Sequence, residues 1–513
     1  MAIYIIRAGP LPIPHWLAFR AALIGPVGVT WLEPSIAPYM IDHRVYGVSN
    51  AAMVIIPVLL QVAIASISLA LDSIHSTTLR WALWREGRLR HNTNLRLFTF
   101  SKEHGPNAWP ANLVSSLGLA LTYGGASMTM FPVTVTAVFG YGERAGSYIY
   151  NFDADFGPDR FGISFNAWGL LGLGIGLLLQ STICTWCLIH DASEHVVGTW
   201  NSNPLATARA SQRLLHGAET NRNRQNLTLS ETTTRQPSML ATIPAARTIT
   251  NGIWAIFALQ TVITIAVSIV ASVQGKATLD RVRALEDNAD FLTVWRYFGL
   301  LAVQYNAGFR RLRMEWAGLL IQSCFLSILL FGLHLADVLA GLTRDEAIWR
   351  RATTTGASPE SNSFLDGLRS WPTCFVFVFK AIVPWISSFG VACIIKLFLA
   401  ILPLVTVSVL FLILAGCAEY IIRYQPKGPQ PATYGDVRAL AALVDDWGDE
   451  GNSTIFWGVK DQYEYVQGVR AQLAGTSGRR LADWQPGRTY AGLEAQAKTE
   501  SMAVVNQGRE VIC

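Results

Sequence analysis

The sequence consists of long apolar runs separated by basic, polar or glycine- and proline-rich stretches. The clearest run, residues 51–71, contains no charged side chain and is followed directly by Asp72. A helix needs about 20 apolar residues to cross the hydrocarbon of a bilayer, where it satisfies its own backbone hydrogen bonds. The runs predict six spans, at residues 51–71, 112–139, 167–189, 252–272, 316–339 and 397–417. We therefore expect an all-α polytopic membrane helix bundle.

A seventh apolar run, residues 375–395, differs from the other six because it contains Lys380, Pro384 and Gly390. It leads directly into the span at 397–417, and residues 391–399 include neither Gly nor Pro for a turn. A lysine at the membrane centre costs about 2.5–3.5 kcal/mol on insertion scales. These observations favour an in-plane or re-entrant helix over a further crossing.

Three segments outside the spans complete the chain. Residues 1–50 form an extramembrane segment, since prolines and glycines break the continuous apolar stretch that a signal peptide needs. Within the transmembrane region, residues 51–423, a loop at 201–250 has no aromatic residue and is rich in Thr, Asn and Arg. Such a composition predicts disorder. Residues 424–513 are expected to form a soluble C-terminal lobe and a loose tail.

The C-terminal lobe is predicted from its apolar residues, which a disordered tail lacks. Apolar side chains recur at helical spacing from Val437 to Trp447. Aromatic segments of extended type follow at residues 454–459 and 463–469. We expect a small α+β lobe that folds around its own core.

The charge distribution agrees with a membrane protein. Charged residues make up 15% of the chain, against about 25% in soluble domains. The net charge of +5 is small, and basic residues lie near the ends of the runs, which favours lipid headgroups over nucleic acid. A basic connection at 72–111 and an acidic one at 139–164 place the N-terminus outside by the positive-inside rule, although the arginine-rich segment 276–313 departs from it.

The basic segment from Arg80 to Lys102 is a candidate lipid-binding element. It contains Trp81 and Trp84 on a helical register among its basic residues. Each Lys or Arg near an anionic bilayer surface contributes about 1 kcal/mol to binding. This composition suits an amphipathic helix that lies against anionic lipid. It is also explained by a topology signal alone, and the two roles are compatible.

Several stretches resemble uncharacterised multi-pass membrane proteins of filamentous fungi. The most specific is the block at residues 71–127, which begins LDSIHSTTLRWALWREGRLR. GTWNSNPL at 198–205, GDVRALAALVDDWGD at 435–449 and WGVKD at 457–461 are similar to that family as well. The resemblance implies a shared membrane architecture. It implies no activity and no functional residue, because none is assigned to the family.

One cluster of side chains has the chemistry of a metal site, at the end of the third span. Cysteine, histidine and carboxylate ligands at helical spacing suit zinc or iron. The alternative is two buried thiols followed by an ordinary polar helix end. The candidates are Cys184, Cys187, His190, Asp191, Glu194 and His195. The oxygen-rich segment 151–159 has its glycine one position too late for a calcium loop.

Polar residues inside the spans are the other candidates. Gln61, Gln180, Gln260 and Gln322 lie in four different spans. Such groups mark a solute path in some membrane proteins and form interhelical packing bonds in others. The sequence has no phosphate-binding GxxxxGK[ST] loop, no GxSxG nucleophile motif and no set of histidine clusters for a di-iron centre.

These observations favour a non-enzymatic integral membrane protein that acts as a scaffold or interaction protein. Its expected partners are the lipid bilayer and a protein that binds the C-terminal lobe, and we expect no catalytic residue and no cofactor. A small-solute transporter or channel is the alternative, and a membrane metalloenzyme that uses residues 184–195 is a second one. The sequence does not distinguish the plasma membrane from an endomembrane.

Overall fold

The computed structural model describes residues 45–48, 50–93, 99–134, 161–215, 230–231, 235–274, 302–305, 311–393, 397–447, 454–466, 469–482 and 489–491. The N-terminal segment 1–44, the acidic segment 151–159 and the tail after 491 lie outside the described residues.

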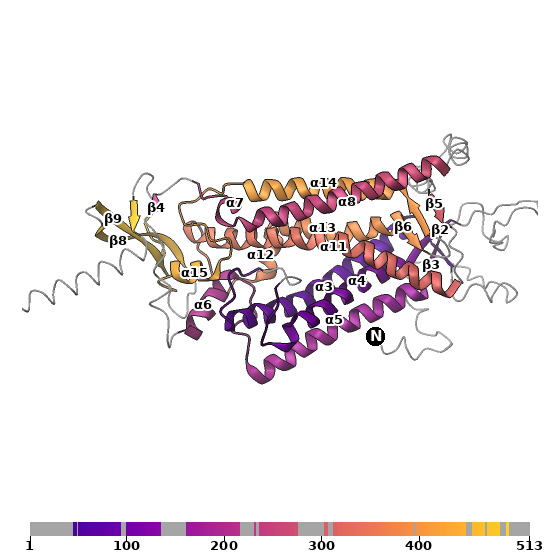
Figure 1. Ribbon diagram of the computed structural model, residues 1–513. Helices are drawn as coiled ribbons and strands as arrows, with labels where there is room; N and C mark the ends of the chain where they lie inside the picture. The colour runs from indigo at the N-terminus through magenta and orange to yellow at the C-terminus, as the bar shows by residue number, and fades with distance from the viewer. Residues whose placement is uncertain are drawn as a thin grey trace, which may run out of the picture.

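A bundle of long helices forms the body of the protein (Figure 1). In the described residues, seven helices have 20 or more residues and lie lengthwise beside one another. Strand pairs at one end of the bundle join the end of one helix to the start of the next, so consecutive helices run in opposite directions. The seven are α3 (Asn50–Arg85), α4 (Trp109–Thr129), α5 (Ala167–Glu194), α8 (Ala245–Gln274), α11 (Arg311–Arg350), α13 (Trp371–Gly390) and α14 (Ile401–Arg423).

Six of these helices are long and apolar enough to cross a membrane: all except α4. They carry large apolar side chains on their outer surface, including Leu59 on α3, Val262 on α8 and Leu320 on α11, while their inner faces share one apolar core. Water disfavours a wide exposed apolar surface and lipid does not. The chain is therefore a multi-pass membrane protein built as a helical bundle, as the sequence predicts.

Helix α13 differs from the predicted in-plane or re-entrant helix. It is continuous, is apolar enough to span, and lies along α11 and α14. Lys380 does not enter lipid alone, since its Nζ lies 2.9 Å from Asp337 Oδ2 on α11. The turn before α14 is made by the antiparallel strands β6 (Val391–Cys393) and β7 (Leu397–Ala400). Backbone hydrogen bonds close this turn, so it needs no Gly or Pro.

Helix α4 also differs from the predicted span at 112–139, because it ends at Thr129 and continues as strand β2 (Met130–Thr134). All side chains from Thr122 to Thr129 are buried. Small and hydroxyl residues fill this part of the helix, so α4 packs inside the bundle and lacks the hydropathy of a lipid-facing span.

Helices α4 and α5 approach each other closely through glycines. A Cβ atom on Gly176 of α5 would lie 2.5 Å from the backbone nitrogen of Thr122, and one on Gly125 of α4 would lie 2.2 Å from that of Leu173. Gly174, on the other face of α5, has open space around it. Small residues of this kind allow two membrane helices to approach closely.

Two small antiparallel sheets tie helix ends together at the end of the bundle remote from the C-terminal lobe (Figure 1). In the first, the order is β1 (Val45–Val48), β3 (Phe161–Phe165) and β2, with Val45 opposite Ser164 and Met130 opposite Phe165. In the second, β7 lies between β5 (Ala302–Tyr305) and β6.

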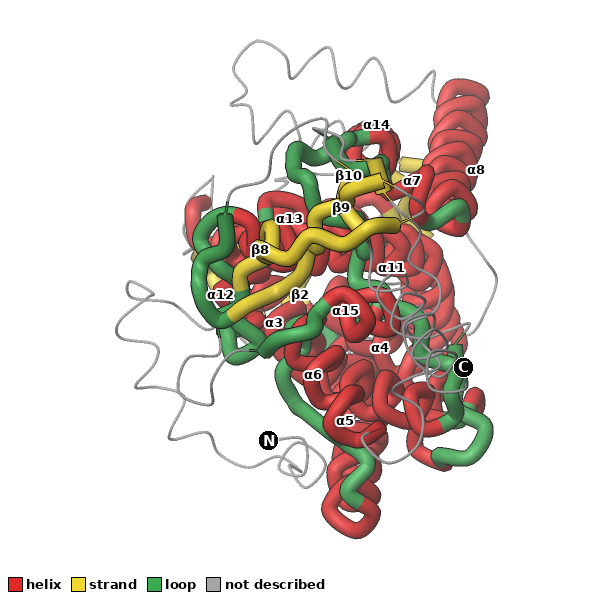
Figure 2. Tube along the Cα trace, turned by 90° about the vertical axis from the view of Figure 1, so that its left-hand side faces the viewer, coloured by secondary structure: helices red, strands yellow, loops and turns green. Residues whose placement is uncertain are grey.

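The opposite end carries the α+β lobe (Figure 2), which confirms the predicted fold class. The predicted helix at 436–447 is shorter than expected, since it ends at Leu443. Of the predicted inward stripe, Val437, Leu440 and Val444 are buried, whereas Trp447 is only partly buried. The helices and strands of this end are η2 (Gly105–Asn107), α6 (Pro204–Leu215), β4 (Ser230–Glu231), α7 (Met239–Thr242), η4 (Arg351–Thr353), α12 (Ser363–Arg369), α15 (Val437–Leu443), β8 (Phe456–Val466), β9 (Val469–Ser477) and β10 (Thr489–Ala491).

The lobe does not fold around a core of its own. Its apolar cluster combines Leu440 of α15 and Trp457 of β8 with Leu83 of α3, Leu205 of α6 and Trp349 of α11. Helices α3 and α11 have 36 and 40 residues, which is about 54 and 60 Å at 1.5 Å per residue. The hydrocarbon of a bilayer is about 30 Å thick, so both helices continue beyond it into the lobe.

The predicted disorder of residues 201–250 is wrong for the described part of that loop. Residues 204–215 form α6, and residues 239–242 form α7. The segment has no aromatic residue, yet Leu205 and Ala208 are completely buried in the lobe core. Gln212 Nε2 also donates to Ala441 O at 2.7 Å.

Candidate functional site

A polar network lies buried where α3 leaves the bundle and meets the lobe. Arg80, near the end of α3, is only 2% exposed. Its Nη1 donates to Asn92 Oδ1 at 2.5 Å and to Thr207 Oγ1 at 3.1 Å, and its Nη2 donates to Thr77 Oγ1 at 3.1 Å. A buried guanidinium is tolerated only when its N–H groups and its charge are satisfied.

The compensating charge is the fully buried Asp345 of α11. Asn92 Nδ2 donates to Asp345 Oδ2 at 3.0 Å, so the Asn92 amide stands between the carboxylate and the guanidinium of Arg80. Thr93 Oγ1 donates to the same oxygen at 3.3 Å, and Arg344 Nη2 donates to Oδ1 at 3.1 Å. Side chains thus connect α3, α6 and α11 in one network.

The segment that precedes α15 is attached to the same part of α11. Glu346 Oε2 accepts hydrogen bonds from the backbone nitrogens of Thr433 at 2.9 Å and Tyr434 at 2.7 Å. Asn92 N donates to Gly435 O at 2.8 Å. Gly435 has a φ of +74°, and a Cβ there would lie 2.8 Å from Asp345 Oδ2, so only glycine fits. The C-terminal part of the lobe is therefore fixed to the bundle by buried polar contacts.

The predicted amphipathic helix at residues 80–102 is wrong. Residues up to Arg85 continue α3, and both Arg80 and Trp81 are buried. Trp81 Nε1 donates to Thr199 O at 2.9 Å, and Arg85 Nη2 donates to His195 O at 2.8 Å. The connection between α5 and α6 therefore covers part of the face that the sequence assigns to lipid.

The loop after α3 is ordered around one carboxylate. Burial alone would raise the pKa of Glu86, but hydrogen bonds lower it to about 2. Glu86 accepts from Ser101 Oγ at 2.5 Å, from the backbone nitrogens of Lys102 and Glu103, and from Arg88 Nη1 at 2.8 Å. Arg88 is therefore paired inside the protein.

Two of the four intramembrane glutamines form interhelical packing bonds. Gln180 Nε2 of α5 donates to Thr122 Oγ1 of α4 at 2.7 Å, and Gln260 Nε2 of α8 donates to Leu404 O of α14 at 3.3 Å. Gln61 and Gln322 are also buried. Among the described residues, Gln61 Oε1 and both polar atoms of the Gln322 side chain have no hydrogen-bond partner. The hydrogen bonds of Gln180 and Gln260 thus join two different pairs of helices.

The charged pair between α11 and α13 is a site that sequence reasoning missed. Lys380 and Asp337 form an ion pair of 2.9 Å, and their side chains are 21% and 30% exposed. Lys380 lies nine residues inside Trp371, which is about 13 Å along the helix axis. Tyr123 of α4 and His334 of α11 lie close enough to interact electrostatically with this pair. An acidic residue in one apolar run and a basic residue in the next were the sequence signal that could have indicated this ion pair.

The predicted metal ligands at the end of α5 point in different directions. Cys187 is in an apolar cluster with Ala111 and Ile183, and Cys184 Sγ donates to Leu71 O at 3.2 Å. Among the described residues, no three His, Cys, Asp or Glu side chains form a group that could hold a metal ion.

The polar end of α5 has ordinary structural contacts. Asp191 Oδ1 accepts from Val197 N at 2.7 Å, His190 lies 3.5 Å from Glu194, and His195 ends the helix with a left-handed conformation. The His190 ring lies edge-on to His104, with ring centroids 4.2 Å apart. Burial, together with nearby His190, lowers the pKa of His104 to about 4.

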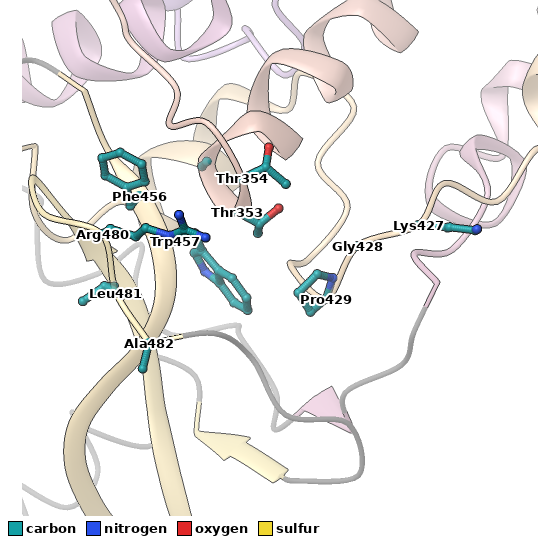
Figure 3. Close-up of a pocket in the computed structure, with 11 residues that line it drawn as sticks. Thr353, Thr354, Lys427, Gly428, Pro429, Phe456, Trp457, Arg480, Leu481 and Ala482 are labelled. Carbon is teal, nitrogen blue, oxygen red and sulfur yellow. The ribbon is translucent and has the colours of Figure 1, made fainter.

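Two cavities lie at the lobe end of the protein. The larger, of about 420 Å³, lies beside the end of α11 and is lined by Ile348, Arg351, Thr355, Gly356, Ala357, Ser358, Ser361 and Arg369. The smaller, of about 270 Å³, lies between η4, β8 and the segment after α14 (Figure 3). There the Arg480 guanidinium lies beside Trp457, whose indole points toward Pro429, while the Lys427 side chain points away.

Comparison with known proteins adds no relative: no protein-family model matches the chain, and neither curated proteins nor solved structures give a significant match.

Proposed function

We propose that this protein is a non-enzymatic membrane scaffold whose lobe binds a partner protein at the membrane surface. The observation that supports this proposal is the shared core, in which Leu83 of α3 and Trp349 of α11 pack with Leu440 of the lobe. A lobe that is continuous with two membrane helices keeps a fixed orientation to the bilayer. A scaffold needs such an orientation, whereas a tethered enzyme domain does not.

The cavity of Figure 3 is the proposed contact site for that partner. Phe456, Trp457 and Pro429 supply apolar walls, and Arg480 supplies one cation at the rim. A volume of about 270 Å³ accommodates one large side chain of a partner. Protein interfaces concentrate their binding free energy in pockets of this kind, where aromatic and arginine side chains are enriched.

We also propose that the lobe faces the cytosol. Basic residues gather near the membrane at this end of the bundle, and such residues remain on the cytosolic side. They include Arg85, Arg88, Lys102, Arg247 and Arg423. A cysteine placed at the exposed Lys102 should resist an impermeant thiol reagent in intact cells and react after permeabilisation. Labelling in intact cells would reverse the orientation.

Affinity purification from cells tests the scaffold proposal. The wild-type chain should co-purify one or more proteins in stoichiometric amount, and Arg480→Glu should reduce their recovery at unchanged expression. Arg479→Glu is the matched control, because Arg479 is exposed and does not line the cavity. Equal recovery with wild type and Arg480→Glu would reject the cavity as the contact site. Absence of any stoichiometric partner would reject the scaffold.

A second function, passage of protons or small ions through the bundle, is favoured by the partly exposed Lys380–Asp337 pair. Ionisable residues inside a membrane commonly mark such paths. Purified protein in liposomes should then dissipate a pH gradient reported by an enclosed dye. Asp337→Asn should slow this flux at least tenfold. Equal flux with protein-free liposomes would remove the transport proposal and leave the pair as a packing element.

A further inference from the structure

We propose that α12 and the cavity behind it form a binding site for one anionic phospholipid. The acyl chains of this lipid lie along the outer face of α12, and its phosphate enters the 420 Å³ cavity. This inference concerns lipid and is independent of the partner-binding cavity proposed above.

The outer face of α12 is apolar and exposed. Phe364 is 66% exposed, Leu368 57% and Trp371, two residues after the helix, 53%, and Leu365 lies exposed between them. A cluster of four large apolar side chains within eight residues is unusual on a surface that faces water.

The opposite face of α12 fixes this orientation. Asp366 is 2% exposed and forms an ion pair with Arg351 Nη1 at 2.5 Å. The other oxygen of Asp366 accepts from Ser361 Oγ at 2.6 Å. Asn362 caps the helix through its side chain, which accepts from Phe364 N at 2.9 Å. Because the polar face is bonded to the protein, the apolar face must point away from it.

Lipid is the occupant that the surroundings indicate. Trp371 begins the membrane helix α13, so the α12 face continues directly into a lipid-facing surface at exposed Val378. Exposed aromatic residues also lie at the lobe-side ends of other helices of the bundle, with Tyr420 near the end of the membrane helix α14 and Trp109 at the start of α4. Aromatic belts of this kind mark the headgroup level, where apolar faces of surface helices enter the acyl boundary.

The charge of the cavity selects an anionic headgroup. Its lining contains two arginines, the hydroxyls of Thr355, Ser358 and Ser361, and no acidic side chain. Arg351 is neutralised by Asp366. Among the described residues, Arg369 forms no ion pair, which leaves the site with one net positive charge. Arginine and hydroxyl donors are the usual partners of phosphate oxygens.

Lipid titration of the detergent-solubilised protein tests the headgroup selection. Binding of phosphatidylglycerol and phosphatidylcholine is measured by native mass spectrometry, with inorganic phosphate as a third ligand. The anionic lipid should bind most tightly, and Arg369→Gln should weaken it about fivefold, the equivalent of about 1 kcal/mol for one basic residue at the surface. The exposed lobe residue Arg479, substituted as Arg479→Gln, should leave the affinity unchanged.

Three outcomes of this titration overturn the proposal. Equal affinity for the two lipids would mean that the cavity does not recognise the anionic headgroup. Equal affinity of wild type and Arg369→Gln would mean that the anion binds elsewhere. Binding of inorganic phosphate as tight as that of phosphatidylglycerol would mean that the acyl chains contribute nothing, and the site would then serve a soluble anion.

Photo-crosslinking in native membranes tests the acyl contact. Benzoylphenylalanine at Phe364 should label phospholipid, and the same probe at exposed Leu214 of α6 measures background labelling. Lipid labelling from position 364 at or below that background, or labelling of a protein instead, would overturn the lipid assignment. This readout needs no knowledge of the scaffold partner, so its failure is distinguishable from failure of the proposed function.

Discussion

Truncation of Leu83 tests whether the lobe depends on the membrane helices. Leu83 lies on α3, is 1% exposed and packs in the same cluster as Leu440, which follows it by more than 350 residues. Replacing a buried leucine by alanine typically costs about 2–5 kcal/mol. A loss of about 3 kcal/mol raises the population of the opened lobe roughly 100-fold, at 1.4 kcal/mol for each factor of ten.

Limited trypsin digestion of the purified protein measures this population. When opening is fast relative to cleavage, the cleavage rate follows the fraction of opened molecules. Cleavage after Arg438 and Lys460 should therefore accelerate roughly 100-fold in Leu83→Ala and comparably in Leu440→Ala. Leu59→Ala is the matched control, because Leu59 lies on the same helix and is 60% exposed towards lipid. If Leu440→Ala accelerates cleavage and Leu83→Ala stays within threefold of wild type, the lobe has an independent core and the shared-core argument fails.

Three further predictions concern other contacts. Gly176→Ala should overpack the α4–α5 contact at a cost of about 1–3 kcal/mol and therefore lower the thermal midpoint of unfolding in detergent, whereas Gly174→Ala, which faces open space, should leave that midpoint unchanged. Equal midpoints for the two variants would contradict the close α4–α5 contact. Asp345→Asn leaves Arg80 buried without its counter-charge and should cost about 3–5 kcal/mol in urea unfolding, and a neutral result would mean that solvent reaches the network. The pKa of His104 is about 4 in the folded protein, so the unfolded chain binds more protons between pH 6.5 and 4, and the free energy of unfolding should fall as pH decreases through that window. His104→Asn should make the free energy of unfolding depend less on pH there. An unchanged pH dependence would assign it to other groups.

The membrane helices could be predicted from the sequence because a span is defined by local composition. The inward face of α15 could be predicted for the same reason, since Val437 and Leu440 follow a helical period. Residues 204–215 show the limit of this approach. Averaged over a fifty-residue loop, composition indicated disorder, although a single twelve-residue helix buries Leu205 completely.

The polar contacts of the site could not be predicted, because their partners are distant in the chain. Asn92 and Asp345 are separated by 253 residues, and Lys380 and Asp337 by 43. Pairs at such separations leave no periodic pattern. Lys380 therefore looked like an obstacle to membrane insertion, and Arg80 like a surface charge, until the folded structure supplied a counter-charge for each.

The shared core also sets the order in which the protein is completed during synthesis. Leu83 and Arg80 emerge early, yet the residues that cover them include Asp345, Leu440 and Trp457. At about 5–20 residues per second, more than 350 residues take roughly 20–70 s to translate. During that interval the end of α3 presents an incompletely covered apolar surface to the chaperones and proteases of its compartment, and Arg80 lacks its counter-charge until Asp345 has been made. A chain that stops between Arg423 and Leu440 retains its membrane spans but leaves the apolar surface around Leu83 without the part of the lobe that covers it, and quality control can therefore distinguish it from the full-length protein.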